Sequence, residues 1–281
     1  MLFVEAFLFI VGLAMGSFLN VVILRYKEDK NVFNISYLSG RSHCPHCKSQ
    51  LRWYELLPIF SFIYQKGKCN HCGKKISWQY PLIELATGFI FLLPLAISHI
   101  PLAISVLWVL AFVIFLLIWA IDYRLYLIPD ELNISLFILA VVKIILDQRF
   151  KLFGNFQGSF MGGYADIFGL RHNIWINHLS AAAIGAIIIV FFILISRGRG
   201  MGLGDLKLMF VLGLLFGWPD IVLIFMLGSL VGALVSVPLL VLRKKGMKDL
   251  LPFAPFLIIG SILIFFFGEM ILRGYFNLFT I

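Results

Sequence analysis

Long apolar runs alternate with short polar segments along this chain, and the pattern predicts a protein that crosses a membrane several times. A hydrocarbon core about 30 Å thick needs about 20 apolar residues per spanning helix. The expected fold class is an all-α polytopic membrane protein with about eight transmembrane helices. The candidate spans are Leu2–Leu24, Pro81–Ser98, Leu102–Ile121, Leu132–Leu146, Ile174–Ile195, Met201–Trp218, Ile221–Leu242 and Pro252–Leu272.

Two of these runs are unusual. Leu132–Leu146 is short for a span, and Met201–Trp218 contains Asp205, Lys207 and four glycines. A broken or re-entrant helix in the second run would be tolerated where protein surrounds it or water reaches it. The Gly- and Phe-rich segment from Asp147 to Asn173 is expected to be an external loop.

Composition agrees with a membrane protein. The chain is 61% hydrophobic and 13% charged, against about 45–50% and about 25% in soluble domains. The first run is apolar from Met1, without a basic leading segment or a small-residue cleavage site, so it is expected to be a retained span rather than a cleaved signal peptide.

The basic residues give the orientation. The net charge is +9, and the distribution of Lys and Arg follows the positive-inside rule when the cysteine-bearing loop is placed in the cytoplasm. The N-terminus is then outside. We expect membrane lipid as a partner and no nucleic acid. The side opposite the cysteine loop keeps only a few basic residues, which are Lys143, Arg149, Lys151, Arg171 and Arg273.

Four cysteines occur as two C-x-x-C pairs, Cys44 with Cys47 and Cys69 with Cys72. Each pair forms a tight knuckle that can offer two thiolates, and two knuckles complete the tetrahedral shell of a closed structural zinc site. Reduced thiols or redox pairs are the alternative. Neighbouring histidines could compete as ligands, although four cysteines already fill the shell. We expect structural zinc in a small cytoplasmic domain over residues 26–79, between a first transmembrane helix at 1–25 and a larger membrane domain at 80–281.

Two acidic residues lie in or beside predicted spans. Asp122 closes the third run and Asp205 opens the sixth, both at the predicted cytoplasmic side. Carboxylates in a membrane are costly, so each is a functional-site hypothesis. If the two carboxylates meet, they can share a proton and divide the roles of base and acid.

The acidic residues could also serve purely structural roles. Asp122 could pair with Arg124, and Asp205 could cap a helix with Lys207 as its counter-ion. Asp130 could act in the site or, more in keeping with its position, cap the fourth span. Glu84 could contact either a basic partner or the substrate.

Four stretches, in this order, resemble the bacterial prepilin peptidase family, the G-x-G-D intramembrane aspartyl proteases. They cover most of the chain: Gly16–Val22; Arg41–Cys47, continuing through Trp53–Pro58 and Cys69–Cys72 to Tyr80–Glu84; Asp122 through Asp130; and Gly202–Leu208.

The resemblance implies an enzyme of the bacterial inner membrane. Such enzymes remove the basic leader of type IV prepilins or type II secretion pseudopilins after a leader glycine. Many then methylate the new N-terminus with S-adenosylmethionine. By position, Asp122 and Asp205 match the catalytic pair, Asp130 matches a recurrent aspartate, and the four cysteines match the zinc domain. The resemblance identifies no residue that binds the methyl donor. The segment from Asp147 to Asn173 is longer than the family's usual connection.

Three other functions are compatible with parts of the pattern. An ion-coupled transporter or channel could use the same intramembrane carboxylates, but it would not need the cysteine loop, and no inverted repeat is visible. A non-catalytic zinc-binding assembly factor would need no carboxylate pair. A peptidase without methylation would not need the complete cysteine set.

Overall fold

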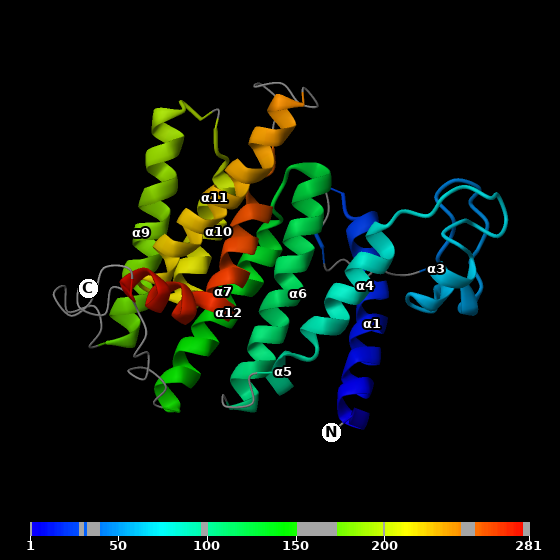
Figure 1. Ribbon diagram of the computed structural model, residues 1–281, viewed down its shortest axis with the longest axis horizontal. Coiled ribbons are helices and arrows are strands. Elements are labelled where there is room, and N and C mark those ends of the chain that lie inside the picture. The colour runs from blue at the N-terminus through cyan, green and yellow to red at the C-terminus, as the bar shows by residue number, and fades with distance from the viewer. Residues whose placement is uncertain are drawn as a thin grey trace. The chain divides into compact units, whose positions relative to one another are not determined.

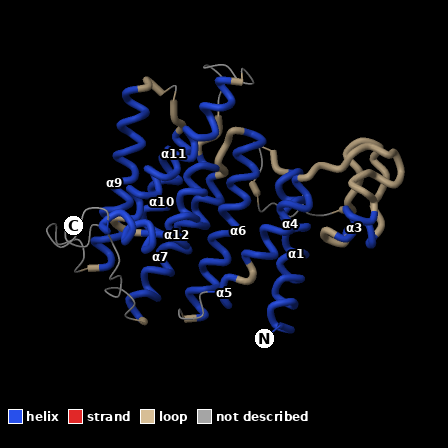
Figure 2. Tube along the Cα trace, in the orientation of Figure 1, coloured by secondary structure: helices blue, strands red, loops and turns tan. Residues whose placement is uncertain are grey.

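A computed structural model describes residues 2–27, 31–32, 40–96, 101–150, 173–198, 200–242 and 251–277. In these residues the regular structure is helical, with two isolated β-bridges in the cysteine-bearing loop (Figures 1 and 2). The all-α fold class is confirmed. The elements are α1 (Leu2–Arg25), η1 (Trp53–Leu56), α3 (Phe60–Tyr64), α4 (Gln79–Ile90), α5 (Leu93–Ala96), α6 (Leu102–Leu125), α7 (Asp130–Arg149), α9 (Ile174–Ile195), α10 (Leu203–Phe216), α11 (Asp220–Val241) and α12 (Ala254–Asn277).

The membrane character is confirmed, while the number of spans is not. Seven of the eight apolar runs lie mainly on one helix each, and the described part of Pro81–Ser98 is divided between α4 and α5. Four of the described helices are long and apolar enough to cross a bilayer. They are Phe3–Arg25, Leu102–Leu125, Ile174–Ile195 and Asp220–Val241. Gln79–Leu95 and Ala254–Gly268 are shorter apolar helices.

The two unusual runs are continuous helices. α10 is not broken, and α7 extends beyond its predicted end through Arg149. The first residues of the expected external loop are therefore helical, and residues 151–172 of that loop lie outside the described part of the chain.

The chain separates into two compact units, Met1–Ala120 and Ile121–Ile281. In the first unit, α1 and α4 pack side by side. A side chain at Gly16 would bring a Cβ within 2.6 Å of the Glu84 backbone, so the small residue permits this close approach. The Asn20 amide on α1 donates a hydrogen bond to the Tyr80 carbonyl at 3.1 Å and fixes the helices near the end from which the cysteine loop extends.

In the second unit, α10 is the central helix and packs against α7, α9, α11 and α12. With only 14 residues it is short for a span, but its neighbours shield most of it, so it is not required to meet lipid at both ends. The contact with α9 is close because Gly213 lies against the α9 backbone, where a Cβ would be 2.6 Å from the Ala181 carbonyl oxygen. Dense packing encloses α10 from Leu208 onward, whereas its N-terminal turn, which carries Asp205, is less buried.

The other end of α10 is fixed by Asn177 of α9. The Asn177 side-chain NH₂ donates to the Trp218 backbone carbonyl at 3.1 Å, and the Asn177 side-chain oxygen accepts from the Trp218 backbone N–H at 3.0 Å. Gly217 between the helices has a φ of +86°, which favours glycine. The turn between α10 and α11 is thus specified by its backbone and by a buried amide.

Candidate aspartyl site and cysteine cluster

Asp205 is the third residue of α10, and its carboxylate folds back over the start of that helix. Its Oδ2 accepts the Gly202 N–H at 3.1 Å, which satisfies a donor that the helix leaves unpaired. Gly202 is exposed, and nothing closer than 3.8 Å would meet a Cβ there. The missing side chain therefore leaves space for an approaching group beside the Asp205 carboxylate.

Asp122 lies in the last turn of α6 and is only 5% exposed. Its carboxylate accepts a hydrogen bond from the backbone N–H of Ala254, at the start of α12. Among the described residues, its Oδ2 has no hydrogen-bond partner. A buried carboxylate oxygen without a partner is costly, and it is suited to hold a proton or a reacting water.

The structure brings Asp122 and Asp205 together. Both belong to the second unit, and the Asp205 carboxylate acts directly on Asp122 by electrostatic repulsion. Two such groups cannot both ionise freely, so they are able to share one proton. The arrangement can supply one carboxylate as base and one carboxyl as acid.

The remaining acidic residues have different roles from those expected. Asp130 does not cap α7; the N-cap is Pro129 and makes no side-chain cap. Instead, Lys207 donates to both carboxylate oxygens of Asp130, at 2.7 and 2.9 Å. Lys207 therefore forms its ion pair with Asp130 rather than with Asp205, for which it was a possible counter-ion.

The cysteine loop contains two knuckles of the same design. In the first, the Cys44 N–H donates to the Ser49 carbonyl, and in the second the Cys69 N–H donates to the Lys74 carbonyl, at 3.0 and 2.9 Å. Each knuckle turns at a residue with positive φ that directly follows its second cysteine, Lys48 or Gly73. The repeated spacing thus yields two turns of the same backbone geometry, each of which carries two thiols.

The four Sγ atoms converge, as the sequence predicts for a metal site. All lie within 4.8 Å of one another, and Cys44 and Cys72 are 4.0 Å apart. Zinc–sulfur bonds of about 2.3 Å in a tetrahedron place sulfurs about 3.8 Å apart, so the cluster fits a zinc ion closely. Other groups of metal-ligating side chains are not found in the described residues.

The thiols titrate unequally. Hydrogen bonds from the Ser49 side chain and backbone lower the pKa of Cys47 to about 6. The Lys74 N–H lowers the pKa of Cys72, but burial and the other three cysteines together raise it to about 11. Four thiols this close resist joint ionisation unless a cation compensates the charge.

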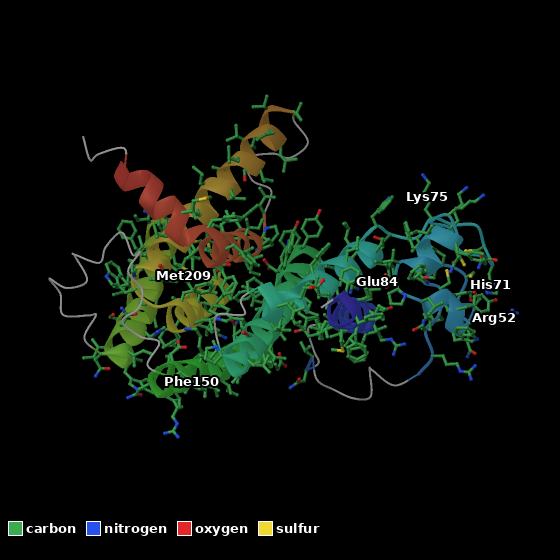
Figure 3. The ribbon with its side chains drawn as sticks, turned by 60° about the horizontal axis from the view of Figure 1, so that its bottom comes forward. Arg52, His71, Lys75, Glu84, Phe150 and Met209 are labelled. Atoms are coloured by element: carbon green, nitrogen blue, oxygen red, sulfur yellow. The ribbon has the colours of Figure 1, made fainter. Side chains whose placement is uncertain are left out.

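Two buried carboxylates hold the cysteine loop together and to the membrane helices. Glu55 accepts the Arg52 N–H at 2.8 Å and the Asn70 amide at 3.0 Å, which ties η1 to the second knuckle. Glu84 on α4 accepts the Ile59 N–H at 2.8 Å and bonds to the Ser17 side chain of α1. These contacts explain Glu84, which Figure 3 labels on α4, without a basic partner or the substrate.

Sequence reasoning missed the Ala254 N–H, Glu55 and Ile59. Ala254 acts through its backbone, and no residue type indicates that. Glu55 has a weak signal, because it is one of only three acidic residues in the basic loop over residues 26–79.

Comparison with known proteins finds a match for each of the two regions of the chain that carry these residues. Residues 10–98, which include the cysteines, match the bacterial peptidase A24 N-terminal domain, and residues 108–237, which include both aspartates, match the type IV leader peptidase family. No solved structure matches the chain.

Curated relatives match over nearly their whole length. The prepilin leader peptidase/N-methyltransferase of Bacillus subtilis (strain 168) is 33% identical over 95% of this chain and 96% of its own. The proteins of the same description from Aeromonas hydrophila and Pseudomonas aeruginosa are each 29% identical, over 95% of this chain and 92% and 91% of their own. Because the similarity exceeds 30% with the first and spans nearly all of both chains, this chain belongs to the type IV leader peptidase family.

Proposed function

We propose that this protein is a prepilin leader peptidase and N-methyltransferase, with Asp122 and Asp205 as its catalytic residues. Its substrates are type IV prepilins or pseudopilins with a basic leader. The observation that carries the peptidase assignment is the approach of Asp205 to Asp122, a buried carboxylate with one unpartnered oxygen among the described residues. Family membership supports the choice of substrate.

The pair would hydrolyse the peptide bond after the leader glycine. One aspartate, ionised, takes a proton from water as the water oxygen attacks the scissile carbonyl carbon. The other, protonated, donates a hydrogen bond to the carbonyl oxygen as negative charge develops there. Collapse of the tetrahedral intermediate breaks the carbon–nitrogen bond, and the proton taken from water passes to the leaving amine. The dyad is left with one proton, ready for another turnover.

Each aspartate has a role suggested by its surroundings. Asp122 is buried and keeps an oxygen free, while Asp205 is partly exposed next to the open space at Gly202. The substrate would approach from the Asp205 side. Its apolar helix could remain in lipid while the basic leader stays in water.

We further propose that the active site and the cysteine domain face the cytoplasm of a bacterial inner membrane, with the N-terminus outside. The distribution of Lys and Arg supports this orientation. Residues 26–79 form the zinc domain in this proposal, between a first transmembrane helix at 1–25 and the membrane peptidase domain at 80–281.

In the cysteine domain, Cys44, Cys47, Cys69 and Cys72 would hold a structural zinc ion. Four thiolates close the coordination shell, so the ion would supply folding free energy to a loop with little apolar core. Methylation of the new N-terminal amine would draw on S-adenosylmethionine, which supplies the methyl group. No residue is assigned to the methyl donor.

The assignment is tested by cleavage of a prepilin in detergent or lipid, followed by mass spectrometry. Wild type should remove the leader and, with S-adenosylmethionine, add one methyl group. Asp122→Asn and Asp205→Asn keep the side-chain shape and remove the titratable proton, so each should lower the cleavage rate by about 10²–10⁴-fold. Asp220→Asn, at the start of α11, is a matched control for loss of one partly buried aspartate in the same unit.

Folding must be monitored in the same preparations. The variants should keep the helical content and melting behaviour of wild type. If a well-folded Asp122→Asn or Asp205→Asn protein cleaves as fast as wild type, the dyad assignment is wrong. If wild type fails to cleave any prepilin, the substrate assignment is wrong.

A further inference from the structure

The segment from Trp53 to Tyr64, covering η1 and α3, exposes an unusual amount of apolar surface. Trp53 is 77% exposed, Phe60 71%, Ile63 66% and Tyr64 80%. Large apolar side chains scattered singly on a surface are normal, but a contiguous set from one short segment marks a binding surface. We call this set the aromatic ridge.

The ridge has a protected side that faces the protein. Phe62 packs its ring on Trp78, with centroids 5.0 Å apart, and Trp78 is the N-cap of α4. Glu55 turns inward to the Arg52 N–H and the second knuckle. The exposed side chains therefore belong to a held segment with one free face, and they do not result from a loose loop.

The segment is held beside α4, not beyond its end. The Ile59 N–H bonds to Glu84, which lies in the second turn of α4 and also bonds to Ser17 of α1. Ile59 has a φ of +61°, an unfavourable conformation for a β-branched residue, so its surroundings must impose it. Figure 1 shows α3 level with the bodies of α1 and α4, two apolar helices of the same unit.

The neighbouring apolar helix also exposes large apolar side chains. Trp78 is 69% exposed, Leu82 61% and Phe89 62%, all on or next to the apolar helix Gln79–Leu95. Trp and Tyr concentrate where a bilayer meets water, because their rings are amphipathic. A short element with Phe and Ile between Trp and Tyr, held beside an apolar helix, has the composition of a segment that lies in the plane of the interface.

The charge around the ridge selects the partner. Among residues 40–80 the sole acidic side chain is Glu55, which is buried. The basic residues of the same range are Arg41, Lys48, Arg52, Lys66, Lys68, Lys74 and Lys75. A zinc ion with its four thiolates has a net negative charge, but the basic side chains outnumber it and the net charge of the region stays positive. It would repel a basic leader peptide and attract anionic headgroups.

We propose that the aromatic ridge is a lipid-binding element that lies in the membrane interface next to α4, with its basic neighbours on anionic phospholipid headgroups. It anchors the cysteine domain against the leaflet at which α1 ends and α4 begins. The anchor adds a lipid contact to the contacts that Glu84 and Trp78 already make with this domain. The proposal does not depend on the catalytic assignment.

The test uses photo-crosslinking in the full-length, zinc-loaded protein. Benzoylphenylalanine replaces Phe60 or Tyr64, both close in shape to the probe, and the protein is placed in nanodiscs of phosphatidylglycerol and phosphatidylcholine in equal amounts. The matched control carries the probe at His46, which is exposed on the first knuckle. Intact-mass and peptide analysis after irradiation identify the adducts.

We expect phospholipid adducts at positions 60 and 64, several-fold above the yield at position 46, with phosphatidylglycerol at least twice as frequent as phosphatidylcholine. Changing both Lys66 and Lys68 to Gln should reduce that preference while the total lipid adduct persists. Absence of lipid adducts at both positions, or equal yields at all three, would overturn the proposal. Replacement of lipid adducts by pilin adducts when a prepilin is added would also overturn it, because the ridge would then be a substrate surface.

Discussion

Lys207 reaches from α10 to both carboxylate oxygens of Asp130, the first residue of α7, at 2.7 and 2.9 Å. The pair joins residues 77 positions apart, and Lys207 is two positions beyond Asp205. Both side chains are about half exposed, at 51% and 61%. An exposed ion pair of this kind contributes about 0.2–1 kcal/mol, so it assists the position of α10 without dominating it.

Asp130→Ala and Lys207→Met should each leave the cleavage rate within about tenfold of wild type, because the ion pair contributes less than about 1.4 kcal/mol of free energy. The exchanged variant, with Lys at 130 and Asp at 207, should recover part of any loss. Steady-state cleavage measures this. A loss above about 100-fold for Asp130→Ala, without recovery in the exchanged variant, would show that Asp130 acts in the chemistry itself.

Gly217→Ala should destabilise the protein by at least about 1–3 kcal/mol. Its φ of +86° disfavours a side chain, and a Cβ would lie 2.5 Å from the Asn177 side-chain oxygen that holds the turn. Thermal unfolding in detergent measures the loss. Gly202→Ala is the control, because its φ is ordinary and its Cβ would meet open space. Equal melting temperatures for the two variants would contradict this account of the turn.

Zinc affinity should fall as the pH falls. Thiolates bind the metal, so binding releases protons, and acid returns them to the cysteines. The Ser49 hydrogen bonds lower the pKa of Cys47 to about 6, so this thiol should be among the last to be reprotonated. Competition with a chelator across a pH series measures the affinity. Ser49→Ala should shift zinc release to higher pH, and an unchanged release profile would contradict the role of Ser49.

Glu55→Ala should speed zinc release and loosen η1 from the second knuckle. The change leaves the Arg52 N–H and the Asn70 amide without their acceptor, at a cost of about 1–3 kcal/mol when such groups stay buried. The rate of zinc transfer to a chelating dye measures the effect. Gln65→Ala, in the same domain, is the control. Identical rates for both variants would show that Glu55 does not support the cysteine cluster.

Local patterns in the sequence predicted many of the helices and the cysteine cluster. Apolar runs predicted the helices, since a helix in lipid must satisfy its own backbone within one segment. The C-x-x-C spacings predicted two knuckles, because two thiols on one tight turn suit one ion. Counting basic residues along the chain predicted that Asp122 and Asp205 lie at the same side of the membrane, and this stays a prediction.

Contacts between distant segments were decided by tertiary structure alone. Helix packing determines that Lys207 pairs with Asp130. It also determines that the Ala254 N–H bonds to Asp122 and that the Ile59 N–H bonds to Glu84. Hydropathy alone does not fix the number of spans, because apolar residues read alike whether they face lipid or a neighbouring helix, as the short, enclosed α10 shows. Composition and spacing report what a residue can do, whereas its partner is set by close packing of side chains that are far apart in the chain.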